Sequence, residues 1–345
     1  MHSSLKPPPK DRSVCRQFAA LDPVRDIILD HLCNIAPTTT ILVNKHCYKR
    51  TVPVLYEKAL LSPYLLYGIT CGDREQYLRT ANALQHVRAL EIDDMRCMAF
   101  LREFSIPPLT DSAPFPIEPQ DILGGVERLE MPWTVLHFRD WDSYRYIYQS
   151  QGQEQRMLNV DPTRLKEVVL HVDDDDILFA GMSFKNSWRQ LGELPKLITY
   201  IFHITASSEY EYAFKSLLQY DYGPVATVRV ILRLTEDITY KDERKWQDEF
   251  GSSVSEIIVK ASQRRLRNHG KLAEDPSRWP DSITKLEIYT PESQRIVSLV
   301  RKLVTKQDDK VWKYIQRYRE IKDVHEGILE EYGLSARQMM IKQKA

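Results

Sequence analysis

A six-residue apolar pattern that recurs along the chain places the strongest constraint on its fold. The pattern is apolar-x-x-apolar-x-apolar, and its middle apolar position falls at residues 90, 129, 168, 200, 228, 257 and 286. Successive separations are 39, 39, 32, 28, 29 and 29 residues, so the spacing settles to a period near 29. Self-similarity at such a period is typical of repeat architectures. We therefore predict seven short strands, one in each repeat.

Each predicted strand alternates its apolar positions, which suits a sheet that is buried on one face. Segments with helical character lie between the strands, for example residues 209–220 and 241–250. A strand followed by a crossover helix, repeated along the chain, gives parallel strands with helices on one side. The sequence therefore predicts an α/β solenoid over residues 67–290. The alternative is a non-repetitive α/β sheet whose strands only look alike.

The hexamers resemble the LxxLxL strand of leucine-rich repeats. That family usually places Asn or Cys five residues past the central leucine. None of the corresponding residues here fits, and they are Met95, Thr134, Asp173, Thr205, Arg233, Ser262 and Pro291. Without a buried amide ladder each turn must satisfy its own backbone groups, so we expect an irregular leucine-rich-repeat-like solenoid.

Residues 21–56 predict a compact set of short helices with more apolar surface than so small a unit can bury. Asp22 is a suitable N-cap, and Pro23 falls at the first helical position, where its missing N–H is no loss. At 100° per residue, the apolar residues of the first helix spread over roughly 240°, whereas a surface helix needs about 100°. These residues are Val24, Ile27, Ile28, Leu29, Leu32 and Cys33. The excess predicts contact on two sides, with the chain's own helices and with another protein.

The same segment resembles an F-box of the fungal kind. The resemblance rests on Leu21, Pro23, Ile27, Ile28, Leu32, Leu42, Val43, Asn44, Lys45, Cys47, Tyr48, Pro53, Val54, Leu55 and Tyr56. The opening departs from the family pattern, because the usual Leu-Pro-x-Glu is here Leu-Asp-Pro-Val at residues 21–24. A second departure is Cys47, which stands in place of a bulky aromatic residue beside Tyr48.

The resemblance implies that the chain joins a cullin–RING ubiquitin ligase through a Skp-type adaptor subunit and holds a protein substrate on its repeat domain. It implies a non-catalytic adaptor, so we expect no enzyme activity and no cofactor. The expected contacts with the Skp-type subunit are Leu21, Pro23, Ile27, Ile28, Leu32, Leu42 and Val43.

The alternative is a repeat-type protein-interaction scaffold with no ubiquitin-ligase role, whose first helices only cap the repeats. The two hypotheses differ in where Ile27, Ile28 and Leu32 face. An exposed apolar patch at these residues favours the adaptor, whereas burial against the first repeat favours the scaffold.

The chain is expected to end in helices that cover the last repeat, because an open terminal repeat exposes its core. One helix is expected to follow a cap at Thr290, a second to run from Asp309 through Ile321, and a third to begin at Ser335. The predicted division is a disordered tail over residues 1–16, an F-box-like helical unit over 17–66, the solenoid over 67–290 and C-terminal helices over 291–345.

Composition and charge argue against several classes of partner. Lys plus Arg equals Asp plus Glu at 48 each, so the chain has no net positive charge that would attract nucleic acid or an acidic membrane. The basic run at residues 264–267 is interpreted as a solvated loop between repeats rather than an RNA or phosphate site. The five cysteines include no CxxC pair and indicate reduced thiols. No apolar stretch approaches the ~20 residues that span a bilayer, so we expect a cytoplasmic or nuclear protein.

No catalytic motif is present, since the chain has no HExxH, GxSxG, GxGxxG or P-loop. The four aspartates at residues 173–176 offer carboxylates to a hard cation but better suit a helix start after a strand. His31, Cys33, His46 and Cys47 carry zinc-type donors, yet the first two face about 200° apart on one helix. The aromatic residues between 141 and 148 are expected to pack a loop rather than stack a ligand. We therefore predict no metal site.

Overall fold

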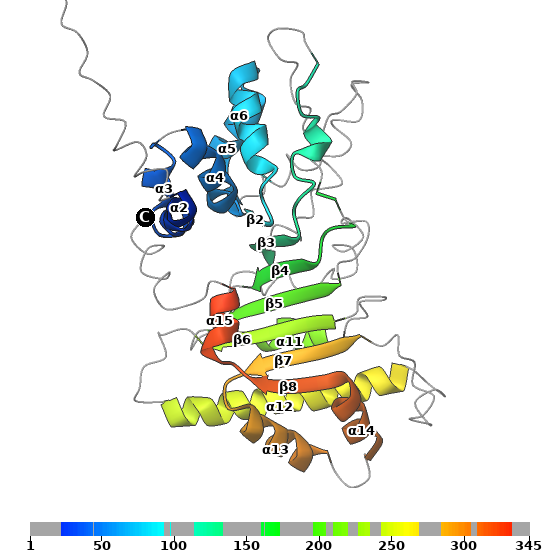
Figure 1. The fold of residues 1–345 in the computed structure, drawn as a ribbon. Helices are drawn as coiled ribbons and strands as arrows, with labels where there is room; N and C mark the ends of the chain where they lie inside the picture. The colour runs from blue at the N-terminus through cyan, green and yellow to red at the C-terminus, as the bar shows by residue number, and fades with distance from the viewer. Residues whose placement is uncertain are drawn as a thin grey trace, which may run out of the picture.

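The computed structural model describes residues 22–43, 45–92, 97, 114–133, 160–161, 163–172, 196–204, 210–219, 227–234, 243–268, 284–304 and 309–332. Within these ranges three N-terminal helices precede an eight-stranded sheet with helices between its strands (Figure 1). The helices are α2 (Asp22–Ile35), α3 (Pro37–Thr40) and α4 (Lys45–Leu55). The predicted α/β class with an N-terminal helical unit is therefore confirmed.

The strands all run parallel and stand in the sheet in chain order, from β1 to β8. They are β1 (Lys58–Leu61), β2 (Ala89–Ile92), β3 (Arg128–Pro132), β4 (Glu167–Val172), β5 (Leu197–Ile204), β6 (Thr227–Leu234), β7 (Lys285–Thr290) and β8 (Arg319–Asp323). Neighbours in sequence are thus neighbours in space, which is the leucine-rich-repeat-like arrangement that the hexamers predict.

Local capping explains where the first connecting helices begin. The Ser62 hydroxyl accepts a hydrogen bond from the Leu65 amide at the start of α5, and the Asp73 carboxylate accepts one from the Gln76 amide in α6.

The connecting and terminal helices are α5 (Pro63–Thr70), α6 (Arg74–Leu84), η1 (Pro119–Asp121), α11 (Tyr210–Gln219), α12 (Glu243–Asn268), α13 (Ser293–Leu303), α14 (Asp309–Tyr318) and α15 (Glu326–Glu331).

The main core lies between the sheet and the helices α5, α6, α11, α12, α13 and α14. Two apolar rows cross the sheet in register and supply its inward face. The first row runs through Leu90, Leu129, Val168, Ile198, Val228 and Leu286, and the second through Met131, Leu170, Tyr200, Val230 and Ile288. The predicted register is correct at five of the strands. It is wrong in β5, where Ile198 rather than Tyr200 occupies the first row, because this strand is apolar at both positions.

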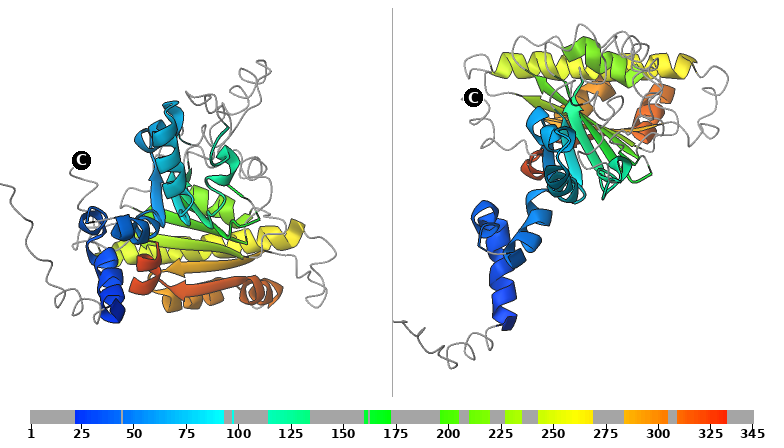
Figure 2. Two further views of the ribbon diagram at one scale, coloured as in Figure 1. Left: turned by 45° about the horizontal axis from the view of Figure 1, so that its top comes forward. Right: turned by 90° about the horizontal axis from the view of Figure 1, so that it is seen from above.

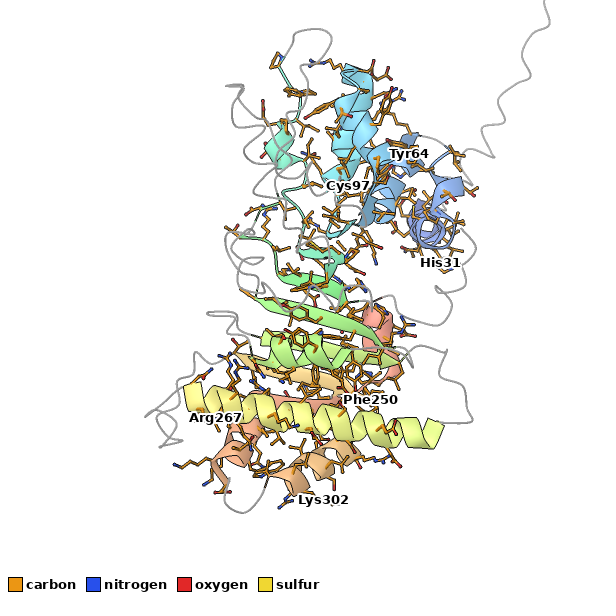
Figure 3. All side chains as sticks on the ribbon, turned by 180° about the vertical axis from the view of Figure 1, so that it is seen from behind. His31, Tyr64, Cys97, Phe250, Arg267 and Lys302 are labelled. Atoms are coloured by element: carbon orange, nitrogen blue, oxygen red, sulfur yellow. The ribbon has the colours of Figure 1, made fainter. Side chains whose placement is uncertain are left out.

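The two faces of the sheet carry different elements. Helices α11 and α12 lie behind the sheet in Figure 1, and α12 crosses in front of it when the molecule is seen from behind in Figure 3. The short helix α15 lies on the opposite side, as the view from above in Figure 2 shows. Most of the charged side chains of the strands lie on the side of the sheet that carries α15. We call this side the polar face.

The sixth predicted strand, at residues 254–259, is wrong. This segment lies inside α12, which runs from Glu243 to Asn268 and also contains the basic run that was expected to be a loop. Its buried residues Val254, Ile258 and Ala261 follow the spacing of a helix, and Ile257 is buried beside them. The segment satisfies the helical period and the strand pattern together, so the short hexamer alone did not distinguish them.

The sheet also extends beyond the predicted range of 67–290 at both ends. Strand β1 precedes it, with Ala59 and Leu61 buried, and strand β8 follows it. The helix expected from Asp309 through Ile321 ends at Tyr318, because Ile321 pairs with Ile288 of β7. The predicted C-terminal helices are correct for α13 and α14, whereas the predicted tail over residues 1–16 and the helix at Ser335 lie outside the described residues.

Candidate protein interface

The three N-terminal helices form a unit with a small interior of its own. Cys33 and Cys47 are each 2% exposed, and Thr51 and Val52 are buried with them. The Cys33 Sγ lies 3.2 Å from the Thr51 Oγ1, and that hydroxyl donates to the Cys47 carbonyl at 2.7 Å. Neither cysteine nor Val52 belongs to the hydrophobic clusters of the sheet. Cys47 is therefore buried in this interior at the position where the resemblance leads us to expect an aromatic residue.

Polar contacts fix the angle between these helices. Arg50 of α4 pairs with Asp26 of α2 at 2.6 Å and with Asp30 one turn further on at 3.1 Å. The hydrogen bond that the Arg50 guanidinium donates to the Asp26 carboxylate is the main cause that raises the pKa of Arg50. The Thr40 hydroxyl of α3 donates to the Leu32 carbonyl of α2 at 3.2 Å. The helices thus present their outer sides in a defined arrangement.

The outer side of α2 is an exposed apolar stripe. Ile27, Ile28 and Leu32 are 69%, 52% and 42% exposed. Val24 and Ile35 are exposed as well, and at 100° per residue the stripe spans an arc of about 140° centred opposite the buried Cys33. An isolated helical unit gains nothing by exposing such a stripe to water, because each aliphatic side chain favours burial by roughly 1.5–3 kcal/mol.

More exposed apolar residues lie in the turn after α3 and on α4. Leu42 is 83% exposed and Val43 is 65% exposed, while Tyr48 and Val54 are partly exposed. Five of the predicted partner contacts are therefore on the surface of this unit: Ile27, Ile28, Leu32, Leu42 and Val43. Pro23 lies in the first turn of α2, and Leu21 lies outside the described residues. We call the exposed apolar residues of α2, together with Leu42 and Val43 in the turn after α3, the apolar stripe.

The sequence reasoning missed a second group of exposed apolar residues directly after the helical unit. Tyr64 and Tyr67 of α5 are 91% and 63% exposed, and Leu60 of β1 is 44% exposed. Figure 3 shows Tyr64 at the end of the sheet that carries the N-terminal helices. The signal in the sequence was the apolar run around α5, which is longer than one buried face of an eight-residue helix requires.

The polar face of the sheet carries a buried ionic network that sequence reasoning also missed. Glu130 of β3 accepts a hydrogen bond from the His171 Nε2 at 2.9 Å and pairs with the Arg128 guanidinium at 3.1 Å. Burial raises the pKa of the Glu130 carboxyl, but the hydrogen bond from His171 and the charges of His171, Lys58 and Arg128 outweigh it and lower that pKa to about 2. These residues come from three strands, so no short motif brings them together.

A second ionic group lies on β6, β7 and β8 of the polar face. Arg229 of β6 pairs with Glu287 of β7 at 3.1 Å, and Lys322 of β8 pairs with the same carboxylate at 3.2 Å. Burial opposes ionisation of Glu287, yet these two cations hold its pKa below the ordinary value. The polar face is therefore charged and internally paired, in contrast to the apolar stripe.

The other candidate chemical sites do not assemble. Cys33 and Cys47 are buried while His31 and His46 are exposed, so the four zinc-type donors do not converge. Within the described ranges no cluster of three or more His, Cys, Asp or Glu side chains is placed to hold a metal ion. The aspartates at 173–176 and the aromatic residues between 141 and 148 lie outside those ranges. The helices that the structure describes include none with the length and hydropathy to cross a bilayer.

Comparison with known proteins isolates the same N-terminal unit. A family described as a protein of unknown function, DUF3760, matches residues 18–58. The match contains α2, α3 and α4 and ends at the first residue of β1. No curated protein and no solved structure matches the chain. The segment that resembles an F-box is therefore also the segment that a protein-family model recognises, as a family without an assigned function.

Proposed function

We propose that this chain is an F-box-like substrate adaptor. Its N-terminal unit binds the Skp-type subunit of a cullin–RING ubiquitin ligase, and its repeat sheet presents a protein substrate. The chain itself performs no bond chemistry, since ubiquitin is transferred by partner subunits. It acts by raising the effective concentration of the substrate near the ubiquitin-charged enzyme.

The observation that carries the proposal is the exposure of the apolar stripe. A helical cap of the repeats would turn Ile27, Ile28 and Leu32 toward the first strand, whereas all three face outward. Figure 2 shows α2 standing away from the sheet, with α4 between them. An exposed apolar surface on a unit that keeps its own small interior is typical of a docking site. This supports the adaptor over the scaffold without a ubiquitin-ligase role.

The proposal also assigns a compartment and a redox state. The cysteines at positions 33, 47, 71 and 97 are present as thiols in the described residues. The Cys33 thiol lies 3.2 Å from the Thr51 hydroxyl, and free thiols persist in a reducing compartment. We therefore place the adaptor in the cytoplasm or the nucleus.

The proposal predicts that Ile28→Asp abolishes binding to the Skp-type subunit. The substitution removes roughly 1.5–3 kcal/mol of apolar burial and adds the desolvation of a carboxylate, so affinity should fall about a hundredfold or more. Pull-down of the purified Skp-type subunit by the full chain measures the loss. Unfolding is not expected, because Ile28 is half exposed in the unbound chain.

Leu303→Asp is the matched control for that experiment. Leu303 is 42% exposed on α13, at the far end of the chain from the apolar stripe. It should leave the pull-down unchanged, and thermal unfolding by circular dichroism should be the same for both variants. Equal capture of the Skp-type subunit by the unmodified chain and Ile28→Asp would rule out the proposed docking surface.

A further inference from the structure

The polar face of the sheet contains an apolar patch that the chain's own C-terminal segment covers. The patch consists of Val169, Ile201 and Ile231 of the central strands with Tyr289 of β7. These residues form a cluster separate from the main core, and its cover is Ile328 of α15 and Tyr332 directly after it. Figures 1 and 2 show α15 on this side of the sheet, opposite α11 and α12.

Tyr332 occupies a pocket built from four strands. Its ring packs under the Arg128 guanidinium of β3, whose Cζ lies 4.6 Å from the ring centroid. Its hydroxyl donates to the Glu167 Oε1 of β4 at 2.8 Å and accepts from Arg229 of β6, and the Thr199 Oγ1 of β5 lies 3.2 Å away. Both sides of the phenol are thus satisfied, and the side chain is only 2% exposed.

Arg128 and Arg229 also bind Glu331, the residue before Tyr332. The Arg229 Nη1 pairs with the Glu331 carboxylate at 3.2 Å, and the Arg128 Nη1 donates to the Glu331 carbonyl at 3.0 Å. Ile328 lies one helical turn before Tyr332 and is 4% exposed on the apolar patch. The bound segment therefore has the pattern apolar-x-x-Glu-Tyr, with each named side chain held by its own contacts.

The pocket does not depend on this segment for its construction. Its residues belong to β3, β4, β5 and β6, which pair with one another through backbone hydrogen bonds. By contrast, α15 has only six residues, too few to be stable as a helix by itself. A pocket on hydrogen-bonded strands that is covered by so short a helix is suited to exchange its occupant.

We propose that this pocket is the substrate-recognition site and takes a protein segment of the pattern apolar-x-x-Glu-Tyr, which displaces residues 324–332. The inference rests on the proposed function in one respect, that the protein so recognised is the one presented for ubiquitination. The contacts of residues 324–332 indicate which side chains the pocket accepts. Because this segment occupies the pocket, it also competes with any other protein segment for binding. A trans ligand must exceed its high local concentration, so only a close chemical match displaces it.

The test uses the full chain and a fluorescein-labelled peptide with the sequence of residues 324–332, VHEGILEEY. In the Tyr332→Ala variant the cis segment loses its anchor, and the peptide should bind at least tenfold more tightly than to the unmodified chain. A peptide with alanine in place of tyrosine should bind at least tenfold more weakly than VHEGILEEY. Adding Arg229→Ala to Tyr332→Ala should remove the gain, because both the tyrosine hydroxyl and the acidic side chain lose a partner.

Tyr212→Ala is the control, since Tyr212 is an exposed tyrosine of α11 on the other side of the sheet. It should leave peptide affinity at the level of the unmodified chain. Equal peptide affinity of Tyr332→Ala and the unmodified chain would overturn the inference.

Hydrogen exchange on the unmodified chain decides the case in which Tyr332→Ala fails to fold. The amides of Ile328 and Leu329 should exchange at least tenfold faster than those of β5 and β6. Protection equal to that of the two strands would make α15 a permanent part of the fold and overturn the inference. Both measurements omit the Skp-type subunit, so they stand or fall separately from the Ile28→Asp pull-down.

Discussion

At the scale of single residues, the sequence predicted the capping residue of α13 incorrectly, although it predicted the helix itself. Thr290 was the expected cap of α13, but the Ser293 amide donates instead to the Asp323 carboxylate of β8 at 2.8 Å. Glu292 adopts a left-handed backbone with φ 54° at this junction. A cap supplied from 30 residues away leaves no local signature.

Glu130 gives a residue-scale prediction that depends on pH. Its pKa is depressed from the ordinary 4.5 to about 2, so its ionised form stabilises the fold fully above about pH 4.5, and this stabilisation is lost as the pH falls through 2. Glu130→Gln should lower the free energy of unfolding by on the order of 3 kcal/mol at pH 7 and by much less at pH 2. Urea unfolding at both values measures the difference.

Glu256→Gln serves as the comparison for Glu130→Gln. Glu256 forms an exposed pair with Lys260 on α12, and such pairs contribute about 0.3–0.5 kcal/mol. Its substitution should change the stability little at either pH. A Glu130→Gln effect of the same size at pH 2 and pH 7 would contradict the ionic role assigned to Glu130.

At the scale of elements, the sequence predicted strands reliably where two apolar positions were separated by a polar residue, as in β2, β3 and β7. It failed where the helical and strand periods coincide, as in α12, and it missed β1 and β8, the two edge strands of the sheet. Strand β8 follows α14 without a break at Tyr318, so only its pairing with β7 marks where the helix ends. Tertiary pairing, not propensity, decides such boundaries.

The helical assignment of residues 254–259 makes a prediction of its own. In α12 Ile258 points into the core and is fully buried, whereas a strand with the hexamer register would turn it outward. Ile258→Ala should therefore reduce the free energy of unfolding by about 2–5 kcal/mol. Lys260→Ala, on the exposed side of the same helix, should change it by less than about 0.5 kcal/mol. Chemical denaturation of the two variants compares them, and equal small effects would contradict the packing of α12.

At the scale of the whole molecule, the chain combines a helical unit with an exposed apolar stripe and a parallel repeat sheet with a charged, partly occupied polar face. The first surface could be predicted from sequence, because its apolar residues exceed what one small unit can bury. The second could not, since Arg128, Glu167, Arg229 and Tyr332 are brought together only by the stacking of strands across more than 200 residues. An adaptor requires two separate surfaces of this kind.

Isothermal titration calorimetry of the purified full chain with a purified Skp-type subunit tests the adaptor proposal most directly. We predict a one-to-one complex with a negative heat-capacity change, because association buries the apolar stripe. Ile28→Asp should lower the affinity about a hundredfold or more, and Leu303→Asp should leave it unchanged. Absence of binding by the unmodified chain, or binding that Ile28→Asp does not weaken, would contradict the account.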